Sequence, residues 1–139
     1  MDVAVSYLNH IALPCSAEGD PDDFYNEILG FVEKYRFSLD RETAWKLFGL
    51  YTEIPVIVLV KGELKIELFL VPFTEHVGLS HICLNCDDIA GVSSKAEAKG
   101  YQVVSSERDS GKVAFIRDGS NNLIELKDIQ SGHIKSPEK

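Results

Sequence analysis

The chain has 139 residues, of which 45% are hydrophobic and 26% are charged, and this suits one small domain with a buried core. Its formal net charge of −8 argues against nucleic acid or an anionic membrane as the partner, because both bind basic surfaces. There is no apolar run of membrane-spanning length, no basic signal-peptide region and only a low, odd number of cysteines, so we expect a cytoplasmic location.

The first half of the chain predicts a strand, a helix and three further strands. The first strand is expected over residues 5–13, with Pro14 ending it. Asp20 is the expected N-cap of a helix that has Pro21 at its first position and ends at Gly30. Strands are expected over 31–39, 56–60 and 64–71. An aromatic-rich stretch over 41–51 predicts one or two helical turns.

The second half predicts the same order of elements. A strand over 78–86 is followed by a helix that opens at Asp87-Asp88 and ends near Lys99, before Gly100. Strands are then expected over 101–105, 113–117 and 123–129, and the tail over 130–139 is expected to be flexible. Each half therefore predicts the order βαβββ.

Two short sequences recur in the two halves. Leu8-Asn9-His10-Ile11-Ala12-Leu13-Pro14-Cys15 returns as Leu79-Ser80-His81-Ile82-Cys83-Leu84-Asn85-Cys86, and Ile66-Glu67-Leu68 returns as Ile124-Glu125-Leu126. Such self-similarity indicates a duplicated unit. More residues separate His and Glu in the first half than in the second, so an insertion is expected over 41–54, in a loop or lid.

The repeated polar residues interrupt apolar strands. Side chains alternate across a strand, so Glu67 and Glu125 lie on the face opposite their aliphatic neighbours, which are expected to face the helices. We expect the sheet to curve, so that the face with the two glutamates forms a concave pocket. Burying a carboxylate in such a pocket costs free energy unless the carboxylate is paired or binds a metal. A lone histidine or glutamate is usually structural, but the matched pairs favour metal ligands, and we predict His10, Glu67, His81 and Glu125 in that role. Two imidazoles and two carboxylates suit one divalent ion of Ni, Zn, Co, Mn or Fe.

The chain resembles the vicinal oxygen chelate (glyoxalase/bleomycin resistance/dioxygenase) superfamily over about residues 6–128. The resemblance lies in the opening strand 8–13, the helix end 24–31 and the segment 115–126, although Asp118-Gly119-Ser120-Asn121-Asn122 replaces the usual Asp-Pro-Asp-Gly turn. It implies an α+β fold in a single domain over 1–139. Two βαβββ modules, about 5–72 and 78–129, would form a cupped mixed sheet with helices on the convex side.

The ligand pattern His, Glu, His, Glu is similar to the glyoxalase I branch, because the epimerase branch more often has Gln at position 67 and extradiol and fosfomycin enzymes use two histidines and one carboxylate. The resemblance implies a metal-dependent lyase or isomerase that moves a proton next to a carbonyl, on a small molecule chelated through two adjacent oxygens. The substrate could be a thiol conjugate such as a glutathione hemithioacetal. Glu67 or Glu125 would be the catalytic base.

Two alternatives remain open at this stage. One is a methylmalonyl-CoA epimerase-like enzyme, and the other is a non-catalytic binding or resistance protein of the same fold. In the latter case Trp45, Phe48 and Tyr51 would stack on a ligand, or simply pack under a loop. Family members often form homodimers, so a homodimer is expected, and the site could close within one chain or across two.

The spacing Cys83-Leu84-Asn85-Cys86 matches a Cys-x-x-Cys motif. Residues three apart on a strand point to opposite faces, so these thiols are not expected to share a metal or a disulfide. Cys83 has the same parity as His81 and is expected to line the pocket.

Overall fold

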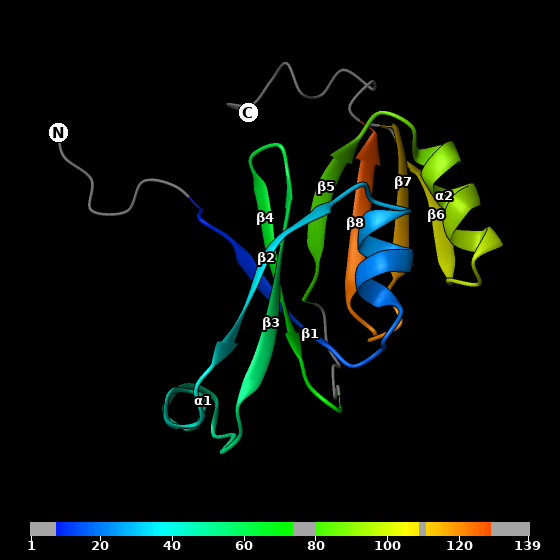
Figure 1. The fold of residues 1–139 in the computed structure, drawn as a ribbon. Coiled ribbons are helices and arrows are strands. Elements are labelled where there is room, and N and C mark those ends of the chain that lie inside the picture. The colour runs from blue at the N-terminus through cyan, green and yellow to red at the C-terminus, as the bar shows by residue number, and fades with distance from the viewer. Residues whose placement is uncertain (1–7, 74–79, 109–110, 129–139) are drawn as a thin grey trace, which may run out of the picture.

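The computed structural model describes residues 8–73, 80–108 and 111–128, which form two open four-stranded sheets (Figure 1). The strands of the first sheet lie in the order β1 (Ile11–Cys15), β4 (Leu64–Leu70), β3 (Ile54–Lys61) and β2 (Val32–Leu39). Those of the second lie in the order β5 (Ile82–Cys86), β8 (Leu123–Asp128), β7 (Gly111–Arg117) and β6 (Val103–Arg108). The predicted α+β fold of two βαβββ modules is confirmed.

The duplication extends to the strand register. In each module the first and last strands run parallel, so that Ala12 lies opposite Glu67 and Cys83 lies opposite Glu125. The other neighbouring strands are antiparallel. Corresponding residues of the repeat therefore take corresponding places in the two sheets.

In the described part of the chain, three helices connect these strands: η1 (Asp20–Asn26), α1 (Arg41–Phe48) and α2 (Ile89–Ala98). Asp40 is the N-cap of α1 and its carboxylate accepts from the Thr43 amide, and Gly49, with a φ of 72°, is the C-cap. Asp88 caps α2 through the Gly91 amide, as the Asp87-Asp88 pattern predicts. The insertion expected over 41–54 is thus a two-turn helix followed by a short connection.

η1 differs from the prediction in its type and its cap. It is a wide π-type turn, in which the Glu27 amide donates to the Asp22 carbonyl and the Leu29 amide to the Phe24 carbonyl. Asp20 was expected as the N-cap, and this is wrong. It is the first helical residue, and its carboxylate accepts from the Gly119 amide instead.

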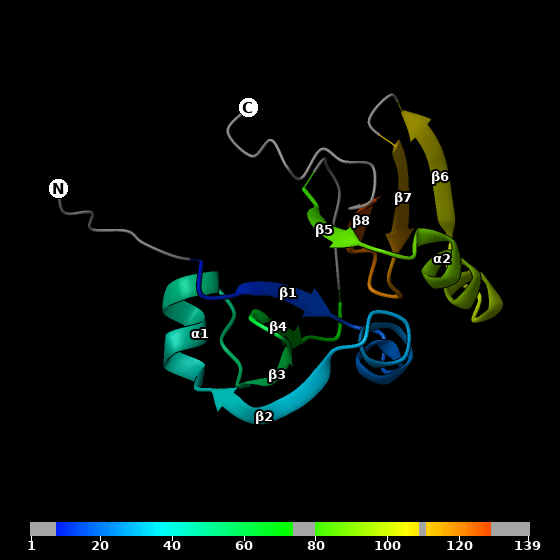
Figure 2. The same cartoon turned by 90° about the horizontal axis from the view of Figure 1, so that it is seen from above.

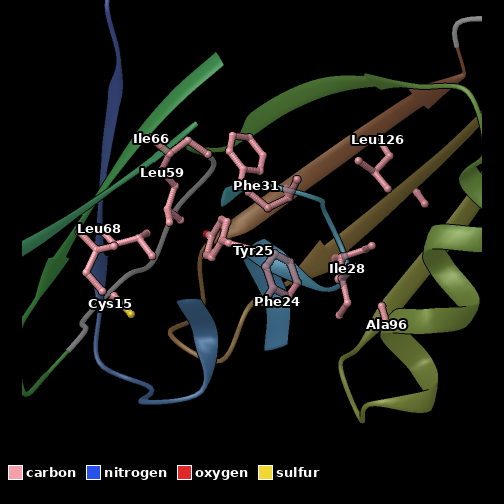
Figure 3. Packing of buried hydrophobic residues seen from close by; sticks show 14 of the residues in the cluster. Cys15, Phe24, Tyr25, Ile28, Phe31, Leu59, Ile66, Leu68, Ala96 and Leu126 are labelled. Atoms are coloured by element: carbon pink, nitrogen blue, oxygen red, sulfur yellow. The ribbon is translucent and has the colours of Figure 1, made fainter. Parts of the chain in front are cut away.

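One hydrophobic core joins both modules. Phe24 and Tyr25 of η1 are fully buried and lie between the aliphatic faces of the two sheets (Figure 3). The sheets contribute the residues beside the two glutamates, as predicted: Ile66, Leu68, Ile124 and Leu126. α2 packs against the second sheet, chiefly against β7, and adds Ile89 and Ala96 to the same core. The core thus occupies the sheet faces opposite Glu67 and Glu125.

α1 lies elsewhere. Its Phe48 ring contacts the Phe69 ring edge-on at 5.8 Å between centroids, and Phe69 shares the face of Glu67. Figure 2 shows α1 and α2 on opposite sides of the molecule, with α1 beyond the curled first sheet. The inserted helix therefore borders the face predicted to carry the site.

Several predicted boundaries shift by a few residues. β1 begins at Ile11 and runs through Pro14, which is tolerated because β1 is an edge strand. β6 runs from Val103 to Arg108, so it begins two residues later and ends three residues later than the strand predicted over 101–105. The predicted tail over 130–139 and most of the predicted link over 72–78 lie outside the described residues.

A buried polar network joins the β7–β8 turn to η1. One oxygen of Asp118 accepts from the amides of Ser120 and Asn122 at 2.9 and 2.8 Å, and the other accepts from the Tyr25 hydroxyl at 2.7 Å. Asn121 has a φ of 72° within this turn, where an asparagine is tolerated better than most residues. The turn that departs from the family pattern thus remains closely hydrogen-bonded.

Ser120 links this turn to the loop after β1. Its hydroxyl donates to Asp20 at 2.7 Å and accepts from the amides of Ser16 and Ala17 at 2.8 and 3.1 Å. Burial raises the pKa of the Asp20 carboxyl, and the Ser120 hydrogen bond partly offsets that rise. This hydroxyl of the second module therefore satisfies three polar groups of the first module.

Replacing Ser120 with alanine is expected to lower the free energy of unfolding by about 2 kcal/mol, because buried amides and a carboxylate lose their partner. The control is Ser38→Ala on the exposed strand β2, which should change it by less than about 0.5 kcal/mol. Urea denaturation measures both. Equal effects of the two substitutions would show that the network contributes nothing specific.

Candidate metal site

The first His–Glu pair joins the start of β1 to the middle of β4. His10 Nε2 lies 3.5 Å from Glu67 Oε1; the Glu67 side chain is only 13% exposed, whereas that of His10 is 36% exposed. His10 Nδ1 lies 2.7 Å from Asn9 Oδ1, which can only accept, so Nδ1 carries the proton. Nε2 therefore faces the carboxylate with either a second proton or a lone pair that a cation could bind.

The second pair occupies the same place in the second module. His81 Nε2 lies 3.2 Å from Glu125 Oε1, and the Glu125 residue is only 8% exposed. The His81 ring contacts the Phe115 ring, which lies opposite Glu125 in the sheet register. Burial raises the pKa of the Cys83 thiol, and the nearby Glu125 carboxylate raises it further. Cys83 thus lines this face, as its parity predicts.

The spacing within each pair fits a divalent ion. Ligand atoms about 2.1 Å from an ion lie roughly 3.0 to 3.4 Å apart when they subtend tetrahedral or octahedral angles. The observed separations of 3.5 and 3.2 Å are close to this range. An imidazole and a carboxylate in each pair also match the preferences of first-row divalent metals.

The two pairs do not meet within one chain. In the ranges 8–73, 80–108 and 111–128, no three His, Cys, Asp or Glu residues lie close enough together to hold a metal. Each sheet therefore presents two of the four predicted ligands. The complete four-residue site stays a prediction.

An apolar cavity of about 410 Å³ lies beside the first pair, between α1 and the Glu67 face of the first sheet. It is lined by Ala12, Leu13, Pro14, Phe48, Leu50, Ile54, Phe69, Val71 and Phe73. The aromatic insert was recognisable from the sequence, but the other residues of this lining were not predicted. The signal was present in the parity of Phe69, which places its ring on the face of Glu67.

The predicted aromatic wall is only partly present. Phe48 lines the cavity, whereas Trp45 and Tyr51 do not, and both are more than half exposed. Trp45 and Tyr51 pack edge-on at 6.3 Å between centroids, and the Arg41 guanidinium lies over the Tyr51 ring. These two aromatic side chains thus stabilise the outer side of the insert.

The cysteines behave as the strand geometry predicts. Cys83 faces Glu125, whereas Cys86 packs against the hydrophobic core on the other side of the sheet. Cys15, Cys83 and Cys86 are all free thiols. The Cys-x-x-Cys spacing therefore forms no disulfide here.

The family model that matches this chain is the Glyoxalase/Bleomycin resistance protein/Dioxygenase superfamily, over residues 7–126. The chain belongs to this superfamily. A curated relative is Glyoxylase I 4 of Arabidopsis thaliana, 26% identical over 129 residues that cover 89% of this chain and 71% of the relative. The superfamily named from the sequence motifs is thus confirmed.

Solved structures show the same fold at low sequence identity. The fosfomycin resistance protein FosX of Listeria monocytogenes, in a mutant complexed with Mn(II) and 1S,2S-dihydroxypropylphosphonic acid, is 20% identical with a TM-score of 0.71, covering 97% of this chain and 99% of that one. A glyoxalase family protein from Bacillus cereus is 21% identical with a TM-score of 0.68, covering 90% and 97%. None of the described helices of our chain has the length and apolar character to cross a membrane.

Proposed function

We propose that this superfamily member is a divalent-metal-dependent lyase or isomerase of the glyoxalase I type. The observation that carries the proposal is the matched pair of His–Glu contacts, at 3.5 and 3.2 Å, on equivalent strands of the two modules. A structural role alone would not require the same two residue types at the same register twice. Mn(II) in the FosX structure supports a divalent ion of the kind predicted from the ligands.

The proposed site is shared between two chains of a homodimer. Because the described part of one chain brings no three candidate ligands together, His10 and Glu67 of one subunit would face His81 and Glu125 of the partner subunit. A twofold axis then creates two equivalent sites per dimer. The two pairs together supply all four predicted ligands of each site.

The chemistry follows from the ligand set. A divalent ion at this site would supply a Lewis acid toward two adjacent oxygens of a small-molecule substrate. One glutamate takes a proton from the carbon beside the carbonyl and returns it to the neighbouring carbon or the opposite face. Glu67 and Glu125 have similarly buried side chains, 13% and 11% exposed, so both remain candidates for the base. The histidines would hold the ion together with the glutamates.

The first substrate to test is the methylglyoxal–glutathione hemithioacetal, a thiol conjugate with adjacent oxygens. An epimerase of acyl-CoA thioesters would use the same proton transfer and is the nearest alternative. We also propose a cytoplasmic location, which the three free thiols support.

A second candidate is a binding or resistance protein without turnover. The apolar cavity beside His10 and Glu67 favours this candidate, because it could hold a small molecule whether or not chemistry follows. Turnover of a true substrate by the metal-loaded protein separates the two candidates.

Metal analysis tests the proposed site directly. Protein purified without added metal or chelator is expected to contain about one divalent ion per chain, and a His10→Ala/His81→Ala double variant is expected to lose it. The matched control is His76→Ala/His133→Ala, which removes two histidines that are not predicted ligands. If the wild-type protein takes up no Ni, Zn, Co or Mn on soaking, the metalloenzyme proposal is wrong.

A further inference from the structure

The apolar cavity is continuous with the face that carries the first His–Glu pair. Pro14 lies opposite Phe69 in the strand register. Pro14 is the fourth residue after His10, and Phe69 is the second residue after Glu67. Each therefore lies on the same strand face as its predicted ligand. Alternate residues of a strand are roughly 7 Å apart, so Phe69 lies within the length of a small substrate from Glu67. A molecule held at the metal site can therefore extend into the cavity.

Every described residue that lines the cavity has an apolar side chain. Its volume of about 410 Å³ lies within the range of small-molecule pockets, and α1 forms one wall through Phe48, with Leu50 just after the helix. Phe48 and Phe73 remain about half exposed at the rim. This is an open, apolar pocket that a charged group could enter only with an uncompensated loss of hydration.

The described residues at the equivalent place in the second module are polar. The residues that correspond to Pro14 and Phe69 are Asn85 and Lys127, which lie opposite each other in the second sheet. β6 ends at Arg108 and β7 begins at Gly111, so their connection is too short for a helix such as α1. The two halves of a shared site thus differ, with an apolar wall on the side of the inserted helix and a polar surface on the other.

We propose that the cavity binds an uncharged apolar group of the substrate, such as an aryl or branched alkyl substituent, and that Phe48 determines this selectivity. The proposal rests on the proposed function, in which the substrate's adjacent oxygens bind the metal held by His10 and Glu67. The apolar group then points along β1 and β4 toward α1. The polar part of the substrate lies against the Lys127 side.

Binding of the uncharged dye N-phenyl-1-naphthylamine to chelator-treated, metal-free protein tests the cavity without any catalysis. We expect fluorescence enhancement with the wild-type chain. Phe48→Ala should weaken dye affinity about fivefold to tenfold, because an apolar wall is lost. The matched control is Leu47→Ala on the same helix, which removes an exposed apolar side chain that does not line the cavity and should leave affinity unchanged.

Selectivity is measured on the metal-loaded enzyme with glutathione hemithioacetals of phenylglyoxal and methylglyoxal. We expect a higher kcat/KM for the phenyl compound, and Phe48→Ala should reduce the phenyl-to-methyl ratio about tenfold. Leu47→Ala should preserve the ratio.

The two experiments separate the inference from the proposed function. If the wild-type protein does not bind the dye, as when a partner subunit fills the cavity, or if Phe48→Ala binds it equally well, the inference is overturned even where hemithioacetals turn over. An unchanged ratio in Phe48→Ala also overturns it. Absence of all turnover overturns the proposed function, while the dye experiment still decides whether the cavity takes an apolar group.

Discussion

Replacing the glutamate that we propose as the base with glutamine is expected to reduce turnover by about 10²- to 10⁴-fold while metal remains bound. The amide oxygen of glutamine can still act as a ligand, but the amide cannot accept the proton. Glu67→Gln and Glu125→Gln should therefore differ, and the variant with the larger loss identifies the base. Glu63→Gln, in the exposed turn between β3 and β4, is the matched control and should keep full activity.

Metal content must be measured on each variant beside kcat and KM. Lost turnover with lost metal indicates a ligand whose charge is needed for binding, and lost turnover with retained metal indicates the base. If both glutamine variants keep full turnover on a true substrate, neither carboxylate moves the proton. The proposed chemistry would then be wrong, although the metal site could remain.

The parts of the fold that depend on local pattern were predictable from the sequence. Strand parity placed Ile66 and Leu68 on the core face and Glu67 on the other, as the structure confirms. The predicted helix ends at Gly30 and Gly100 both have positive φ values, of 86° and 91°, which glycine adopts without strain. Alternation and backbone preferences act within a few residues, and sequence alone carries them.

The role of Asp20 was not predictable in the same way. An acidic residue before a proline predicts an N-cap, but the carboxylate instead accepts from Ser120, which is 100 positions away in sequence. The place of α1 had the same difficulty, since it depends on the Phe48–Phe69 contact between distant segments. Tertiary contacts such as these override a local preference.

Each His–Glu pair of the candidate site was predictable from the sequence, but the way in which the two pairs meet was not. Matched sequences indicated that His10 accompanies Glu67 and His81 accompanies Glu125, and parallel pairing of the first and last strands brings each pair together. Whether the pairs join depends on how the two sheets, or two chains, face each other. No sequence pattern within one module carries that information.

Mixed dimers are expected to show which chains form the site. The His10→Ala and His81→Ala chains should each be inactive as homodimers. In a dimer that contains one chain of each type, one of the two shared sites keeps all four ligands and the other loses both histidines. Co-expression with two different tags and sequential purification should therefore restore about half of the wild-type turnover and metal per dimer.

A site closed within one chain predicts the opposite result, because every chain in the mixed dimer lacks one histidine and no complete ligand set remains. Pairing His10→Ala with the His10→Ala/His81→Ala chain is the control, since neither shared site is then complete. Restoration only in the first mixture can arise only from ligands on two chains. Metal-bound protein that is monomeric by light scattering would exclude the shared site, and the two pairs would then have to approach each other within one chain.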